Sequence, residues 1–244
     1  MGEVHLELAA GVATITIAAP EIRNGLDARM GAALEEICAT INADRSLGAA
    51  VIRGAGGTFC SGADTRAWGP GFDPASPDGV ERVDAIYRAF VSVGDLLVPT
   101  VAAVRGAAVG AGLNLAMAAD LRIVADNARL MAGFLKIGIH PGGGFFSLLN
   151  RLGSRDTTVA MGLFSEEISG SDAARLGLAW RSVPDEIVES TAMDLAKSAA
   201  KDPELTRAAL KSFRTETGPP QVGWPAALEM ERGVQMWSQK RKAL

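Results

Sequence analysis

The most constraining feature of the sequence is a pair of short apolar runs that each lead directly into a glycine-rich corner. AAVIRG at 49–54 runs into GAGGTFCSGAD at 54–64, and PTVAAVRG at 99–106 runs into RGAAVGAGLN at 105–114. Apolar runs of this length, bounded by glycine, indicate buried strands. The second corner continues into an apolar stretch that predicts a helix. Two such units favour a mixed α/β fold.

The segments around these corners continue the alternation of strands and helices. VATITIA at 12–18 alternates in polarity, which predicts a half-buried strand paired with VHLEL at 4–8. The period becomes helical after Asp27, a residue type that favours the N-cap position. LRIVAD at 121–126 and ARLMAG at 128–133 predict two further strands. The repeated order of strand and helix is typical of an α/β chain.

The C-terminal part of the chain has a different pattern. Residues 69–79 are turn formers throughout and predict a surface loop, and strand signals end near residue 184. The helical patterns beyond that point cover 186–200, 203–215 and 225–242. We therefore divide the chain into a mixed core, residues 1–184, and an all-helical region, residues 185–244. Apolar residues in the last helix predict either core packing or an oligomer contact.

Composition excludes several classes of protein. The net charge of −4 and the scattered basic residues disfavour binding to nucleic acid. Two cysteines, Cys38 and Cys60, and two histidines support neither a disulfide framework nor a metal site, so we expect a cytoplasmic protein without a metal. The N-terminus lacks the cationic lead of a secretory signal. The apolar stretch 96–121 contains Arg105 and Asn114, so a buried strand and helix are expected there rather than a membrane span.

Both corners have the chemistry of an oxyanion-binding site. Small residues allow a ligand to approach the backbone, and the first N–H groups of a helix have no partner within the helix. Two such N–H groups aimed at one point stabilise a carbonyl oxygen that becomes negative. Glycine turns are common, however, and neither corner has the spacing of a Walker loop. A nicotinamide-binding fold is the weaker alternative, because GAAVGAG lacks the GxGxxG spacing.

Five motifs, in order, resemble the crotonase family of enoyl-CoA hydratases, isomerases and their relatives, and one of them is a pair of segments. They are TITIAAPEIRNGLD, TFCSGADTR, PTVAAVRGAAVGAGLNLAMAADLRIVADNARL, the pair KIGIHPGGG and ISGSDAARLGLAWRSVP, and the closing MWSQKRK. The resemblance covers nearly the whole chain. It implies an α/β fold with a crotonase-like ββα spiral core and a C-terminal all-helical trimerisation region. It also implies a homotrimer or a hexamer built as a dimer of trimers.

The resemblance also implies an acyl-CoA site in which two backbone N–H groups hold the thioester oxygen. Carried onto this chain, these groups belong to Ala63 and Ala111, the latter usually glycine in relatives. The residues that match the CoA-binding segments of the family are Ile22, Arg23, Gly25, Ser61, Ala63, Asp64, Arg66, Trp237 and Lys240. CoA then enters as part of the thioester substrate, and no tightly bound cofactor is implied. For Trp237, ordinary helix packing is the alternative.

Two positions depart from the pattern of the family. The hydratases of the family use two glutamates, and the matching positions here are Asn114 and Phe134. Hydration requires a proton taken from water and a proton delivered to carbon, and a positioned acid or base contributes ~10²–10⁴-fold to such a step. An asparagine orients water without taking its proton, and a phenylalanine does neither. Ordinary hydratase chemistry is therefore not expected.

His140, in IGIHPGGG, is the best remaining candidate for proton transfer, because imidazole titrates near neutral pH. A structural role beside the glycine turn is the alternative. Tyr87, the single tyrosine, lies in a helix that either lines the acyl pocket or simply packs. Three functions follow: a lyase or isomerase acting on acyl-CoA, an acyl-CoA decarboxylase, and a non-catalytic acyl-CoA-binding protein. All three use an oxyanion site for the thioester in fatty-acid or related acyl-CoA metabolism.

Overall fold

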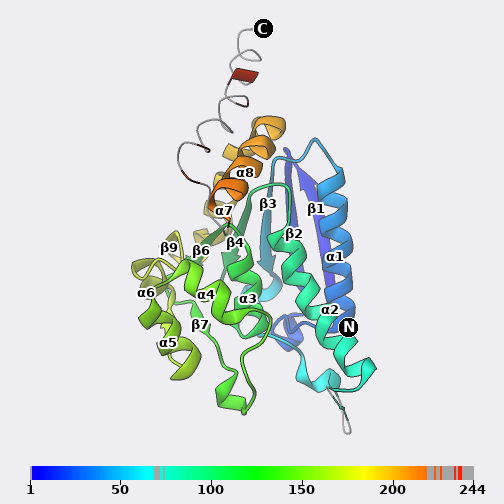
Figure 1. The fold of residues 1–244 in the computed structure, drawn as a ribbon, viewed down its shortest axis with the longest axis vertical. Coiled ribbons are helices and arrows are strands. Elements are labelled where there is room, and N and C mark those ends of the chain that lie inside the picture. Colours follow the sequence, from blue (N-terminus) through cyan, green and yellow to red (C-terminus); the bar gives the residue numbers. More distant parts are fainter. Residues whose placement is uncertain are drawn as a thin grey trace.

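The structure is a computed structural model that describes residues 2–68, 72–73 and 75–218, together with positions 223, 226, 234, 236 and 237. Figure 1 shows the arrangement of its helices and strands. In chain order these are β1 (Glu3–Ala9), β2 (Val12–Ala18), α1 (Ala28–Ala43), β3 (Ala49–Gly54), α2 (Pro77–Gly94), β4 (Thr100–Val104), β5 (Ala107–Val109), α3 (Ala111–Ala118), β6 (Leu121–Ala125), β7 (Arg129–Met131), α4 (Phe145–Leu152), α5 (Arg155–Leu163), β8 (Glu167–Ser169), α6 (Gly170–Arg175), β9 (Arg181–Val183), α7 (Val188–Ala199) and α8 (Pro203–Thr217).

A six-stranded sheet forms the centre of the molecule, in the order β1-β2-β3-β4-β6-β9. β1 and β2 pair antiparallel across a tight turn at Ala10 and Gly11, whose φ angles of 50° and 73° suit a two-residue hairpin. From β2 onward, neighbouring strands run parallel. A smaller sheet has the order β5-β7-β8. The α/β fold class expected from the sequence is confirmed.

Several local predictions agree with the structure. β3 covers residues 49–54, as expected, and α1 begins directly after Asp27. The Asp27 carboxylate accepts a hydrogen bond of 2.8 Å from the backbone N–H of Met30, which is the predicted N-cap contact. The apolar stretch 96–121 forms β4, β5 and α3. In the part of the chain that the structure describes, no helix is long and apolar enough to cross a membrane.

Other local predictions were wrong. β2 is buried on both faces rather than half-buried. On the face expected to be polar, the Arg53 side chain donates a 3.0 Å hydrogen bond to the hydroxyl of Thr16. The loop predicted over 69–79 ends earlier, since Ser76 caps α2 and Pro77 begins it. The sequence pattern also missed the short strands β8 and β9.

Helices cover the central sheet and fix its layers. α1 and α2 pack side by side and α2 contacts α3 (Figure 1). α7 packs against β3, β4 and β6 through buried Val188, Ala192 and Ala196. The core joins these helices to the strands in one continuous apolar cluster. The division of the chain at residue 184 remains a prediction, and the predicted last helix, 225–242, lies almost wholly outside the described residues.

α8 is anchored to the C-terminal end of α1 by one buried guanidinium. The Arg207 side chain is 7% exposed. It donates to the carbonyl oxygens of Ile41 at 3.0 Å and Asp44 at 2.7 Å, and to that of Leu47 at 3.0 Å. The last carbonyls of a helix have no partner within the helix, and a cation suits that end of its dipole. Arg207 thus replaces the missing hydrogen bonds of α1.

Candidate active site

The two glycine-rich corners lie side by side in the structure. The backbone N–H of Phe59 donates to the carbonyl of Arg105 at 2.8 Å, and that of Cys60 donates to Ala107 at 3.0 Å. The carbonyl of Cys60 in turn accepts from Val109 at 3.0 Å. These hydrogen bonds form a short parallel ladder between segment 59–61 and β5. The ladder holds the first corner at a fixed register against the second.

Contact between the corners requires residues without a side chain. A Cβ built on Gly112 would overlap the carbonyl oxygen of Cys60 and lie 2.8 Å from the Cβ of the same cysteine. Gly106 has a φ of +59°, and a Cβ there would overlap the carbonyl oxygen of Gly57. A glycine is therefore needed at both positions, at Gly112 for space and at Gly106 also for its backbone angle.

The N–H groups of Ala63 and Ala111 belong to this junction. Gly62 and Asp64 both bond to Leu26, so the N–H of Ala63 points to the opposite edge of its extended segment. Ala111 is the first residue of α3, where an N–H has no partner within the helix. A Cβ built on Gly62 would lie 3.7 Å from the backbone nitrogen of Ala111, so the two segments adjoin. Both alanines are half-buried and line one cavity.

This cavity has a volume of about 900 Å³ and gathers most of the predicted site. The predicted residues that line it are Ile22, Arg23, Gly25, Ser61, Ala63, Asp64, Arg66, Ala111, Asn114, Phe134 and His140. Trp237 does not join them, and lines instead a second cavity beside α8 together with Arg207 and Lys211. Lys240 lies outside the described residues. Eleven of the thirteen predicted residues therefore line one cavity.

Asn114 lies at the base of the cavity and is 1% exposed. Its amide Nδ2 donates a 2.9 Å hydrogen bond to the carbonyl oxygen of Gly142. Because a carbonyl only accepts, this contact fixes the NH₂ toward Gly142 and Oδ1 away from it. Oδ1 is buried and has no hydrogen-bond partner among the described residues. The position therefore contains no group that takes a proton.

Phe134 provides an apolar wall next to the oxyanion corner. Its ring packs edge-on against Phe145, with centroids 5.4 Å apart. A Cβ built on Gly110 would lie 3.8 Å from the Phe134 ring, so the ring sits beside the start of α3. An aromatic ring here excludes water from the space next to the Ala111 N–H.

His140 lies two residues before Gly142, whose carbonyl oxygen accepts the hydrogen bond from Asn114. It is exposed on the cavity wall, and its Nδ1 lies 2.6 Å from the carbonyl oxygen of Pro141. Nδ1 must donate in this contact, which leaves Nε2 with a free lone pair in the neutral ring. The arrangement suits a group that accepts a proton at Nε2.

Tyr87 reaches the same loop from α2. It lines the cavity, and a Cβ built on Gly142 would overlap its hydroxyl oxygen. Gly142 is therefore contacted by the phenol of Tyr87 as well as by the amide of Asn114. Of the two roles predicted for Tyr87, the structure favours that of a pocket-lining residue.

The predicted CoA-binding residues other than Trp237 and Lys240 line the cavity. The Ser61 hydroxyl donates to the carbonyl of Ile22 at 3.1 Å, and the Ser61 N–H donates to the carbonyl of Arg23 at 3.0 Å. Arg66 Nε lies 2.8 Å from Asp64 Oδ1, and this hydrogen bond holds the pKa of the Asp64 carboxyl below its usual range. Asp64 is therefore an ionised partner of Arg66 and a poor proton donor.

Sequence reasoning missed two charged residues of the cavity, Glu21 and Lys136, and several apolar residues. Lys136 is exposed at its wall, opposite in charge to Asp64, and Met131, Ile137 and Ile139 supply apolar surface. Lys136, Ile137 and Ile139 come from the chain between β7 and α4, where the sequence gives no regular period, and Met131 is the last residue of β7. The lysine among apolar residues in this segment was the sequence signal that could have indicated a cavity wall. Among the residues that the structure describes, no cluster of His, Cys, Asp or Glu could hold a metal ion.

The fold and much of the sequence are shared with known proteins. Residues 7–242 match the model of the enoyl-CoA hydratase/isomerase family. A probable enoyl-CoA hydratase of Mycobacterium tuberculosis is 40% identical over 210 residues, which cover 86% of this chain and 80% of the relative. The 1,2-epoxyphenylacetyl-CoA isomerase of Escherichia coli is 32% identical over 212 residues, with 85% and 81% covered.

A solved structure shows the same similarity in the fold. The crystal structure of an enoyl-CoA hydratase from Bacillus anthracis superposes with a TM-score of 0.85 at 26% identity, covering 96% of this chain and 89% of that one. The chain belongs to the enoyl-CoA hydratase/isomerase family, the crotonases. The predicted family and the crotonase-like fold are thereby confirmed.

Proposed function

We propose that the chain binds an acyl-CoA thioester in the 900 Å³ cavity and stabilises the enolate or oxyanion form of its carbonyl. The observation that carries this proposal is the pair of N–H groups, of Ala63 and Ala111, at one junction on the cavity wall. Oxyanion donors of this kind contribute ~10²–10³-fold each to the rate of acyl chemistry. Arg23, Arg66 and Lys136 supply positive charge that suits the phosphates of CoA.

The reaction we favour is a lyase or isomerase step on an acyl-CoA that avoids ordinary hydration. An enolate forms when a proton leaves the carbon next to the thioester, and the N–H pair stabilises the resulting negative charge. His140 Nε2 is the proposed proton acceptor, since Asn114 and Phe134 cannot accept one. Its protonated form then returns the proton elsewhere on the acyl chain. Fatty-acid or related acyl-CoA metabolism is the setting that fits such a substrate.

Decarboxylation is the second candidate, and a specific observation favours it. Loss of CO₂ from a malonyl-type thioester leaves an enolate without any proton being removed first. A substrate that carries its own carboxylate is repelled by a carboxylate in the site, and Asn114 and Phe134 are both uncharged. The same N–H pair would stabilise the product enolate.

A His140→Ala variant separates these functions. Binding of acyl-CoA is measured by calorimetry, and turnover is measured with enoyl- and malonyl-type thioesters. Loss of turnover with binding retained supports an enzyme that uses His140. Turnover of the malonyl-type thioester that survives the substitution supports a decarboxylase. Binding without turnover in either form identifies an acyl-CoA-binding protein, and no binding of any acyl-CoA at millimolar ligand contradicts the proposal as a whole.

The proposed assembly is a homotrimer or a hexamer, formed through the helical region at 185–244. Exposed apolar residues in the described part of this region, including Ile187 and Phe213, are consistent with contacts between copies. Sedimentation equilibrium of the full chain tests this, and a monomer at micromolar concentration contradicts it.

A further inference from the structure

Two arginines lie at the points where the central strands end and the glycine-rich corners begin. Arg53 is the penultimate residue of β3, and Arg105 directly follows β4. β3 and β4 are parallel neighbours, so the two arginines lie at the same end of the sheet, where these strands finish. Each arginine is followed by a corner that carries one of the proposed N–H donors.

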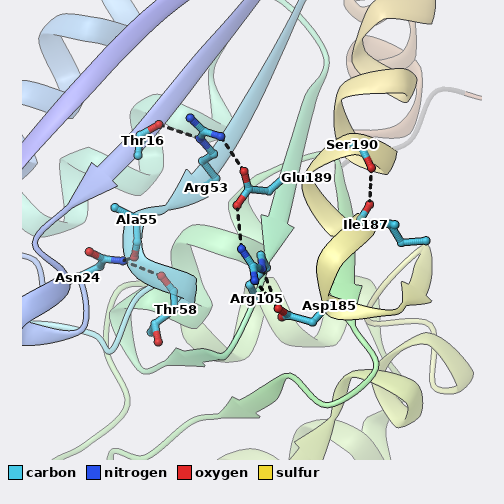
Figure 2. A network of polar contacts seen from close by, with 10 residues as sticks. All are labelled: Thr16, Asn24, Arg53, Ala55, Thr58, Arg105, Asp185, Ile187, Glu189 and Ser190. Carbon is cyan, nitrogen blue, oxygen red and sulfur yellow. Dashed lines mark hydrogen bonds and ion pairs between the residues drawn. The ribbon is translucent and has the colours of Figure 1, made fainter.

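One carboxylate joins both arginines (Figure 2). Glu189, in the first turn of α7, lies with Oε2 2.6 Å from Arg53 Nη1 and with Oε1 3.5 Å from Arg105 Nη1. Asp185 holds the other side of the Arg105 guanidinium, with Oδ2 3.0 Å from Nε. Arg53 Nε also donates to Thr16 Oγ1 at 3.0 Å. Two guanidiniums and two carboxylates thus form a connected cluster.

The cluster is shielded enough to constrain its members. The side chains of Arg53 and Glu189 are each 32% exposed, in contrast to 69% for Glu7, which also faces Arg53 at 3.9 Å. Ion pairs at the open surface contribute little, whereas networked and partly buried pairs hold a fixed geometry. Glu189 is the member that bridges the two strand ends.

Backbone hydrogen bonds connect Arg105 to the segments that carry the N–H pair. The Arg105 carbonyl accepts from Phe59, and the ladder continues through Cys60 to Val109. Gly112 then packs without a gap on the carbonyl of Cys60. A shift of the end of β4 relative to β3 therefore changes the spacing between Ala63 and Ala111.

We propose that Glu189 is a positioning residue, which sets the distance between the Ala63 and Ala111 N–H groups by bridging Arg53 and Arg105 from outside the cavity. This inference rests on the proposed function of that pair. Glu189 does not line the cavity, so it acts through the strand ends and without touching a ligand. The buried apolar residues of α7 hold the helix on the sheet independently of this carboxylate.

The test uses a thioester whose absorbance reports on the oxyanion site. An aryl-conjugated enoyl-CoA absorbs at longer wavelength when donors polarise its carbonyl, and this shift requires no turnover. We expect the wild-type chain to shift the absorbance on binding and Glu189→Gln to lose at least half of that shift. Affinity for the thioester should fall roughly tenfold, as for a misplaced pair of donors. Affinity for free CoA, which has no carbonyl at this site, should stay unchanged.

Glu7→Gln is the matched control, because it removes an exposed carboxylate from the same Arg53 without affecting Arg105, and it should retain the full shift. A Glu189→Gln chain that keeps the wild-type shift overturns the inference. If that variant does not fold, Asp185→Asn, which releases the other side of Arg105, carries the same test with the same outcomes. A wild-type chain that binds the thioester without any shift contradicts instead the proposed oxyanion site.

Discussion

The amide nitrogen of Asn114 donates a hydrogen bond to the carbonyl oxygen of Gly142, at 2.9 Å, and its oxygen is left buried without a partner among the described residues. An amide in this position binds the loop at Gly142, but it moves no proton. With Phe134 at the second position, the described part of the cavity base contains no carboxylate at either point where the resemblance implies a glutamate.

The first prediction concerns the hydration of crotonyl-CoA. We expect the unaltered chain to bind crotonyl-CoA and to hydrate it very slowly, since loss of one positioned acid or base costs ~10²–10⁴-fold. The decrease in enoyl absorbance measures the rate, and calorimetry under the same conditions shows that the site is filled. A turnover on the order of 10 per second or more, which is typical of enzymes, would show that another group does the work of a carboxylate.

The second prediction concerns the contact between Gly112 and Cys60. A methyl group at Gly112 overlaps the Cys60 carbonyl, so Gly112→Ala should push the two corners apart. We expect acyl-CoA affinity and any turnover to fall by roughly 10²-fold, as for a displaced oxyanion donor. Gly94→Ala is the control, because a methyl there meets only ordinary contacts, at 3.7 Å, near the end of α2. Equal acyl-CoA affinity in the two variants would contradict the tight junction of the corners.

Features set by neighbouring residues could be predicted from the sequence. The N-cap of α1 at Asp27 and the buried strand at 49–54 depend on local pattern, and both predictions agree with the structure. The two corners could also be identified, because a run of glycine and alanine directly after a buried strand marks a sharp change of chain direction with room for close backbone approach. Local pattern failed for β2, whose burial on both faces depends on the strands and helices that cover it.

Features that join distant segments could not be predicted. Asn114 and Gly142 are 28 residues apart, and Arg53 and Glu189 are 136 apart. No periodicity connects such pairs, since their contact results from the order of strands in the sheet. For Trp237, the family pattern predicts a contact with CoA. In the structure of one chain, Trp237 instead lines a cavity beside α8.

The third prediction concerns the two thiols. Cys38 and Cys60 are free and buried, and burial raises the pKa of each to about 12. At pH 8 we expect the native chain to consume no thiol reagent within minutes and the unfolded chain to consume two equivalents. Fast labelling of native Cys60 would show that the junction of the corners opens readily.

The raised pKa of these thiols also predicts a direction for stability at high pH. The folded thiols keep their protons up to about pH 12, whereas the unfolded thiols ionise near 9.0. The unfolded chain therefore holds fewer protons between these two values, and the free energy of unfolding falls as pH rises through this window. Replacing Cys38 by alanine should flatten that slope, and an unchanged slope would contradict burial of the thiol.

The fourth prediction concerns the buried guanidinium that joins α8 to α1. Arg207→Ala removes the donors to the carbonyl oxygens of Ile41, Asp44 and Leu47, and the Asp44 carbonyl keeps only the 3.3 Å hydrogen bond from the Leu47 N–H. We expect the free energy of unfolding to fall by about 3 kcal/mol, which is characteristic of a broken buried hydrogen-bond network. Urea unfolding followed by circular dichroism measures the change. Lys211 is exposed one turn further along α8, and Lys211→Ala should keep the free energy of unfolding within about 0.5 kcal/mol of the wild type. Similar losses in both variants would mean that general packing, and not this contact, holds α8 in place.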